Sequence, residues 1–162
     1  MLETIIWVII IGLLLNFIVP RITPKSIRVI FLEFGANRLY KTASKKLEKA
    51  ISEEVKNNKN KKSWEDKKIL DNLISTRNEA EETREKYIKL SERFRHDSNK
   101  RFEIISDWRD YAQLFYDWTE GYEDIQVSRG AVVPDIDRVQ EIYLRSQEII
   151  KRFDKLLSEK DS

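Results

Sequence analysis

Residues 64–94, WEDKKILDNLISTRNEAEETREKYIKLSERF, contain the pattern that decides the fold. Apolar or small side chains recur in this stretch at alternating spacings of three and four, which is the spacing of a coiled-coil seam. Ser63 directly before it and the acidic Glu65 and Asp66 are typical of a helix N-terminus. We therefore expect a long helix from Ser63, with a seam of Ile69, Leu73, Thr76, Ala80, Thr83, Tyr87, Leu90 and Phe94.

The seam fails after Phe94, because its phase then falls on polar residues before apolar ones return at Ile104. Two arrangements fit this failure. Either one helix covers 63–120 with a polar layer in its seam, or a turn over Asp97-Ser98-Asn99 folds the chain into an antiparallel hairpin. The turn is favoured because these three residues are poor helix formers. Gly121 is predicted to end the helix in both arrangements.

A dense cluster of aromatic residues occupies the second half of this region. Trp108, Tyr111 and Phe115 recur at helical spacing, so we expect them in the core. The residues after them cannot all point inward on the same helix, and Trp and Tyr are enriched at binding hot spots. The candidate partner-binding residues are therefore Tyr116, Trp118 and Tyr122.

The C-terminal region is predicted to contain a loop and one more helix. The loop covers 121–134, holds two glycines and ends at Pro134, and it is long enough to suggest a role of its own. After Pro134 a wide apolar stripe recurs at helical spacing, which favours packing on two sides in a helical bundle. That stripe comprises Ile136, Val139, Ile142, Tyr143, Ser146, Ile149, Ile150, Phe153, Leu156 and Leu157.

Upstream of the quoted stretch, residues 24–55 are predicted to form an amphipathic helix. Thr23 is a suitable N-cap, and Pro24 suits the first helical position. The apolar residues between Ile27 and Phe34 recur at helical spacing and can lie in a membrane interface. The same run also fits a short strand by periodicity, but nothing nearby offers such a strand a partner.

Basic charge is concentrated in this upstream region. Residues 21–62 hold twelve Lys and Arg against four Glu, so this region has a net charge of +8. Because the whole chain has a net charge of +2, the remaining residues sum to −6. We expect this arm to bind anionic lipid headgroups, while an ordinary solvated helix face accounts equally well for the basic residues beyond Arg38. The lysines over 57–62 lack a nucleic-acid-binding motif and interleaved aromatics, so nucleic acid is not an expected partner. The candidate membrane-surface residues are Arg21, Lys25, Arg28, Arg38, Lys41, Lys45 and Lys46.

The N-terminal stretch Thr4 to Pro20 is uncharged, and twelve of its residues are Ile, Leu, Val or Phe. As a helix it is about 25 Å long, close to the minimum for a transmembrane span. A cleavable signal peptide would need positive charge before the apolar run and small residues at its end, whereas Glu3 precedes this run. A buried helix of a water-soluble protein would show an apolar stripe, but here the apolar residues encircle the helix. We therefore predict a membrane anchor over 1–20.

The orientation of this anchor follows from its flanking charges. Basic residues lie after the span and none lies before it. By the positive-inside rule, the N-terminus is outside and the C-terminal domain is cytoplasmic in a bacterium, or on the matrix side of a mitochondrial inner membrane.

Motifs for catalysis or cofactor binding are missing from the sequence. It contains no cysteine and one histidine, His96, whose neighbours Arg95 and Asp97 point in other directions on a helix. Its four glycines form no phosphate-binding loop. Glu103, Asp107 and Asp110 share a helix face, but a di-iron site needs a Glu-x-x-His pair that the chain lacks. We expect no enzymatic activity, no metal and no cofactor.

These patterns predict an all-α protein with three parts: the anchor over 1–20, a basic amphipathic juxtamembrane helix and linker over 21–62, and a coiled-coil-like helical domain over 63–162. The expected function is that of a structural or adaptor subunit that mediates protein assembly at a membrane. The alternative is a small membrane-acting effector or sensor, related to phage, toxin or defence proteins. The expected partners are other protein subunits, and the helical faces also allow a homo-oligomer.

Overall fold

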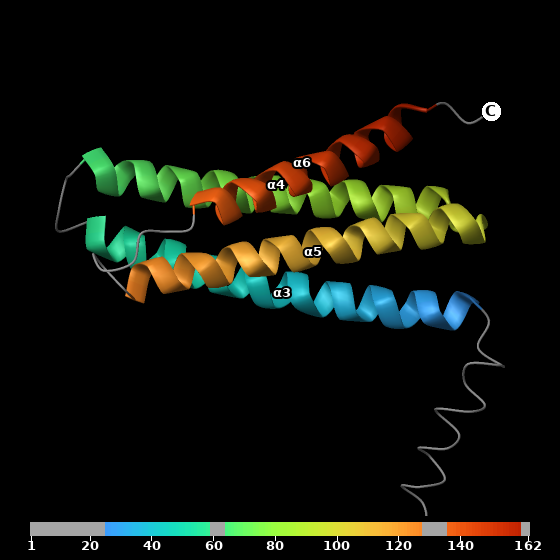
Figure 1. The fold of residues 1–162 in the computed structure, drawn as a ribbon, viewed down its shortest axis with the longest axis horizontal. Helices are drawn as coiled ribbons and strands as arrows, with labels where there is room; N and C mark the ends of the chain where they lie inside the picture. Colours follow the sequence, from blue (N-terminus) through green and yellow to red (C-terminus); the bar gives the residue numbers. More distant parts are fainter. Residues whose placement is uncertain (1–24, 59–63, 128–135, 160–162) are drawn as a thin grey trace, which may run out of the picture.

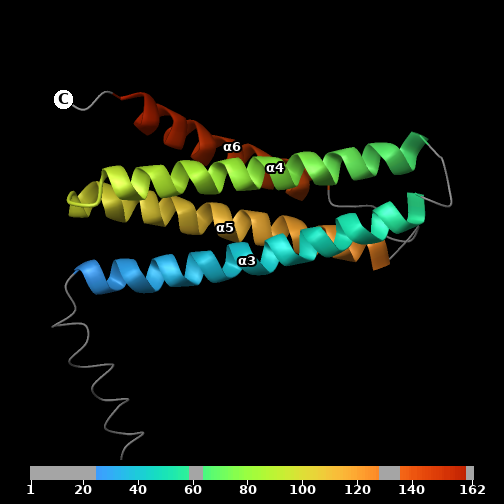
Figure 2. The same ribbon diagram turned by 180° about the vertical axis from the view of Figure 1, so that it is seen from behind.

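The computed structural model describes residues 25–58, 64–127 and 136–159, and within these ranges the chain forms helices and no strand. The helices are α3 (Lys25–Asn58), α4 (Trp64–Arg93), α5 (Ser98–Val127) and α6 (Ile136–Ser158). Consecutive helices run in opposite directions, so α3 is parallel to α5 and α4 is parallel to α6, and both α3 and α6 lie against α4 and α5 (Figure 1). Figure 2 shows from behind that α6 lies on the side away from α3. The predicted helical bundle is confirmed, and the strand alternative for Ile27 to Phe34 is wrong.

The core follows the predicted seams at most positions, but Ile69 of α4 and Val139 and Tyr143 of α6, which the spacing places in the seams, are 38%, 37% and 56% exposed. On α4, Leu73, Ala80, Thr83, Tyr87 and Leu90 are buried. Their spacings of seven, three, four and three keep them on one face of the helix, and Thr76 between Leu73 and Ala80 is half-buried on that face. Small residues in these seams, among them Ala36, Ala43, Ala80 and Ala112, are fully or almost fully buried and leave room for the large aromatic rings beside them.

Trp108 of α5 lies at the centre of the bundle. Its ring stacks on Tyr87 of α4, with centroids 4.6 Å apart, and lies 5.2 Å from the ring of Tyr40 of α3. Its indole Nε1 donates a hydrogen bond to Asn37 Oδ1 at 3.0 Å, which satisfies the polar atom of a fully buried side chain. Three helices therefore meet at one residue.

The predicted break in the long helix is confirmed, because α4 ends at Arg93 and α5 begins at Ser98. Asp97 accounts for the start of α5: its Oδ1 accepts hydrogen bonds from the backbone amides of Asn99 and Lys100 at 3.1 and 3.0 Å. This is the contact of an N-cap residue. Ser98 and Asn99, which the sequence places in the turn, belong to the first turn of α5.

Arg93, the last residue of α4, holds the C-terminal end of α6. Its guanidinium donates to the backbone oxygens of Leu156 at 2.9 Å and Leu157 at 3.3 Å, and also to that of Glu159. Carbonyl groups at a helix C-terminus lack partners within the helix, so a guanidinium there replaces water. Ion pairs join α6 to α4 through Lys86 and Asp154 and to α5 through Arg152 and Asp107.

The prediction that a helix ends at Gly121 is wrong, because α5 continues to Val127. The first half of the loop predicted over 121–134 is therefore helical, and residues 128–135 lie outside the described ranges. A Cβ added at Gly121 would meet nothing within 4 Å, so no close approach requires glycine at this position. Glycine lowers helix propensity without excluding a helix, and packing of the preceding aromatic turns overrides it.

Within the described helices, none is long and apolar enough to cross a bilayer. The predicted span over 4–20 and the linker over 59–62 lie outside the described residues, so the transmembrane anchor stays a prediction.

Candidate functional site: the outward face of α3 and the end of α5

The first ten residues of α3 expose a patch of large apolar side chains. Ile30, Phe31 and Phe34 are 59%, 71% and 69% exposed, and Ile27 beside them is also exposed. On the opposite side of the same helix, Val29, Ala36 and Tyr40 are buried in the core. α3 therefore has two apolar faces at its N-terminal end, one packed in the bundle and one in contact with solvent. We call the outer set, Ile27, Ile30, Phe31 and Phe34, the apolar patch.

Basic residues continue the outward face of α3 beyond the apolar patch. Arg38, Lys41 and Lys45 are exposed and follow Phe34 at spacings of four, three and four, which keeps them on the same side of the helix. Arg28, which follows Ile27 in the sequence, is also exposed. Lys25 is the first residue of α3, and Arg21 lies outside the described residues. The outer side of α3 is thus apolar at its start and basic along its middle.

Lys46, the last of the predicted membrane-surface residues, is half-buried and contacts α5. Its ammonium forms a salt bridge with Glu120 and lies 5.1 Å from the centroid of the Tyr116 ring. The hydrogen bonds from Lys46 and Tyr116 lower the pKa of the Glu120 carboxyl. This lysine joins α3 to α5 and does not point outward with Arg38, Lys41 and Lys45.

The predicted partner-binding residues Tyr116, Trp118 and Tyr122 are all half-buried on α5. Tyr116 lies beneath the Lys46 ammonium, whereas Trp118 stacks on Tyr122 with ring centroids 5.8 Å apart and planes 14° apart. The stack exists because α5 continues through Gly121 and places the two rings one helical turn apart. The sequence analysis missed this stack because it ended the helix at Gly121, which left Tyr122 outside the helix.

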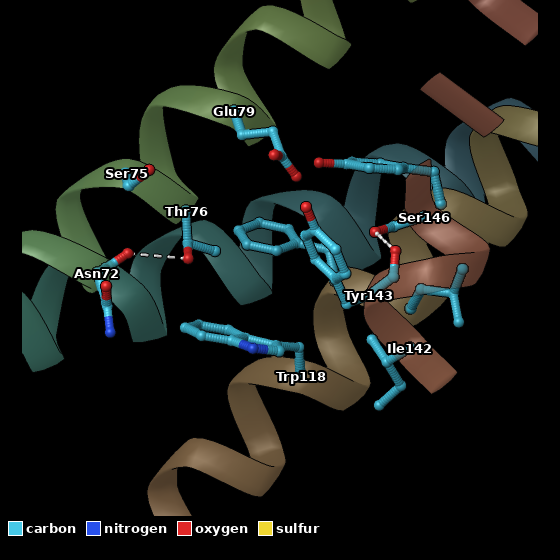
Figure 3. A pocket seen from close by; sticks show the side chains of 11 residues that line it. Asn72, Ser75, Thr76, Glu79, Trp118, Ile142, Tyr143 and Ser146 are labelled. Carbon is cyan, nitrogen blue, oxygen red and sulfur yellow. Dashed lines mark hydrogen bonds between the residues drawn. The ribbon is translucent and has the colours of Figure 1, made fainter. Parts of the chain in front are cut away.

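A pocket between α4, α5 and α6 was not predicted from the sequence. It has a volume of about 360 Å³, and Glu79 and Thr76 of α4, Tyr111, Phe115 and Trp118 of α5, and Tyr143 of α6 line it (Figure 3). In the sequence, most of its aromatic lining residues belong to the predicted apolar stripes of α5 and α6, and Thr76 belongs to the predicted seam of α4. Nothing in these separate patterns indicates that the side chains surround a common space. The side chains meet only when three helices pack.

Of the carboxylates that the sequence groups on one face of α5, Glu103 and Asp110 are exposed and Asp107 contacts α6. Asp107 accepts two hydrogen bonds from Arg152 of α6, at 3.0 and 2.7 Å. This contact raises the pKa of the Arg152 guanidinium, chiefly through the hydrogen bond to Asp107.

Comparisons of the chain with protein-family models, curated proteins and solved structures find no match. The functional argument therefore depends on the described surfaces.

Proposed function

We propose that this protein is a membrane-anchored helical adaptor subunit, in which an N-terminal span holds the bundle at a bilayer and the bundle binds other subunits. The observation that carries this proposal is the outward face of α3. It begins with the apolar patch directly after the predicted span and continues with Arg38, Lys41 and Lys45. This order matches a bilayer, whose apolar interior lies beneath anionic headgroups.

The energetic terms favour contact of this face with lipid. Burying a large apolar side chain contributes about 1.5–3 kcal/mol relative to exposing it, and the four residues of the apolar patch are all exposed. Each basic side chain that reaches an anionic surface adds about 1 kcal/mol. An exposed aromatic patch of this kind is unusual on a water-soluble monomer and marks an interaction surface.

The adaptor part of the proposal uses the end of α5. Tyr116 and the Trp118–Tyr122 stack are half-buried, so their rings are held in place by the bundle while part of each remains open to solvent. Rigid, partly exposed aromatic rings are preferred anchors in protein interfaces because little conformational entropy is lost when they bind. We propose them as the contact with partner subunits.

A labelling experiment tests the membrane contact. The chain contains no cysteine, so a single Phe31→Cys variant of the full chain, reconstituted in anionic vesicles, takes one environment-sensitive fluorophore at the apolar patch. We expect a blue-shifted label that aqueous iodide quenches poorly. Ile88→Cys, at an exposed apolar residue of α4, is the matched control and should be quenched freely. Equal quenching of both labels would exclude contact of α3 with lipid.

Two further variants test anchoring and assembly. Ile9→Arg places a charge in the predicted span and should release the full chain from membranes into the supernatant. Tyr122→Ser should leave the protein in the membrane but remove the partner subunits that co-purify with the wild type after mild extraction. If the wild type instead releases dye from sealed vesicles, the membrane-acting effector is the better description.

A further inference from the structure

The pocket between α4, α5 and α6 has a composition that is independent of the membrane argument. Figure 3 shows the Glu79 carboxylate and the Trp118 ring on different sides of it, with Tyr143 between them. Tyr111 and Phe115 complete an aromatic lining, and both are buried and therefore fixed in position. Among the described residues that line this space there is one carboxylate and no Lys, Arg or His.

Two hydroxyls at the pocket wall donate their hydrogens to backbone oxygens. The Thr76 hydroxyl donates its hydrogen to the backbone oxygen of Asn72 at 2.9 Å, and the Ser146 hydroxyl donates to that of Tyr143 at 2.8 Å. Both hydroxyls thus present oxygen lone pairs to other groups. Gln147 donates to Glu79 Oε2 at 3.1 Å, and no described residue donates to Oε1 or forms a salt bridge with this carboxylate.

We propose that this pocket binds a small organic ammonium ion. The negative faces of aromatic rings attract a cation within about 6 Å of the ring centroid, and quaternary ammonium groups are bound in aromatic cages of this kind. Glu79 supplies the opposite charge, and Gln147 holds it in place. The apolar rings accommodate the methyl or methylene groups that surround the charged nitrogen.

The size and the rim of the pocket suit such a ligand. A volume of about 360 Å³ falls in the range of small-ligand pockets, about 300–1,000 Å³. Tyr143 is 56% exposed, so its side chain is free to adjust when the ligand enters. Tyr143 lies in the first half of α6, so this part of α6 forms the rim of the pocket.

The test uses choline and its uncharged analogue 3,3-dimethylbutan-1-ol, which has the same shape without the charge. Titration calorimetry is done on the full chain in a detergent without a choline group. We expect saturable choline binding with a Kd below about 10 mM, and binding of the alcohol at least about tenfold weaker. Equal affinities, or no saturable choline binding, would overturn the proposal.

Variants identify the side chains responsible. Glu79→Gln keeps the shape of the side chain and an acceptor for Gln147, and should weaken choline binding by about tenfold. Trp118→Leu should weaken it similarly, while Glu85→Gln, at an exposed carboxylate on the same helix, should bind choline as the wild type does. Circular dichroism confirms that each variant is folded. A folded Glu79→Gln variant with wild-type affinity would overturn the assignment.

A competition arm identifies the source of the ammonium group. Phosphatidylcholine vesicles will displace choline if a lipid headgroup reaches the pocket, and phosphatidylglycerol vesicles are the matched control. Displacement by the first vesicles alone assigns the site to a headgroup, and no displacement by either assigns it to a free ion. In both cases the group bound in the pocket is an organic ammonium ion, as proposed.

Discussion

At the scale of single residues, Trp108 joins three helices at the centre of the bundle. It is fully buried, stacks on Tyr87, and its Nε1 hydrogen satisfies the Oδ1 atom of Asn37. Truncation of this side chain would leave a cavity at the point where α3, α4 and α5 meet, and it would also remove the donor for Asn37.

We predict that Trp108→Ala lowers the free energy of unfolding by about 3–5 kcal/mol. Urea unfolding followed by circular dichroism measures this loss. Phe102→Ala is the control, because Phe102 is an exposed aromatic residue on the same helix and its removal should change stability by less than about 0.5 kcal/mol. Similar losses for the two variants would show that Trp108 does not form the centre of the core.

The tyrosines of the core predict a loss of stability in alkali. Burial, and then the 2.5 Å hydrogen bond to Glu33, raise the pKa of the Tyr87 phenol above its ordinary 10.0, and burial likewise raises the pKa of Tyr111. The folded state therefore holds these protons more tightly than the unfolded state. Their contribution is complete below pH 10.0 and is lost as the pH rises from there towards the folded pKa.

We predict that the free energy of unfolding falls above pH 10.0, by up to about 1.4 kcal/mol per pH unit for each such tyrosine. Urea unfolding between about pH 8 and pH 11 measures the slope. Tyr87→Phe should lower the slope by one tyrosine's share, whereas Tyr143→Phe, at an exposed ring, should keep it. An unchanged slope in Tyr87→Phe would contradict the assignment.

At the scale of elements, helical spacing predicts the seams well because each seam records one face of a helix. Leu73, Ala80, Tyr87 and Leu90 are buried as predicted. Contacts between distant residues leave no such record: Lys46 and Glu120 are 74 positions apart, and their pairing depends on how α3 and α5 pack. The pocket was missed for the same reason, whereas the end of α5 was missed because packing overrides the low helix propensity of Gly121.

Gly121 gives an element-scale prediction with a definite sign. Because it lies inside α5 and a Cβ there meets open space, Gly121→Ala should raise the free energy of unfolding by about 0.5–1 kcal/mol. If Gly121 ended the helix in a left-handed conformation, alanine would instead be strained and would lower stability. Thermal melting of the two proteins decides between these signs.

At the scale of the whole molecule, the aromatic cluster makes α3, α4 and α5 mutually dependent. Tyr40, Tyr87 and Trp108 come from three different helices and share their ring contacts. None of these helices can bury its seam alone, so we expect the described bundle to unfold as one unit.

We predict that Leu90→Asp unfolds the whole bundle, because a carboxylate would replace a fully buried side chain with no partner of opposite charge provided for it. Far-ultraviolet circular dichroism should show loss of helix at every temperature. Ile88→Asp, two positions away and exposed, should melt like the wild type. A folded Leu90→Asp variant would show that the inward face of α4 is wrongly assigned.

The two opposite apolar faces of α3 bear on how this protein can be crystallised. Phe31 and Phe34 point away from the side that Val29 and Tyr40 pack into the core, so polar residues can replace them without opening a void. A shortened chain that starts at α3 and carries these replacements would lose the two most exposed aromatic side chains of the described surface. Such a molecule can form lattice contacts in water, without micelles between its neighbours.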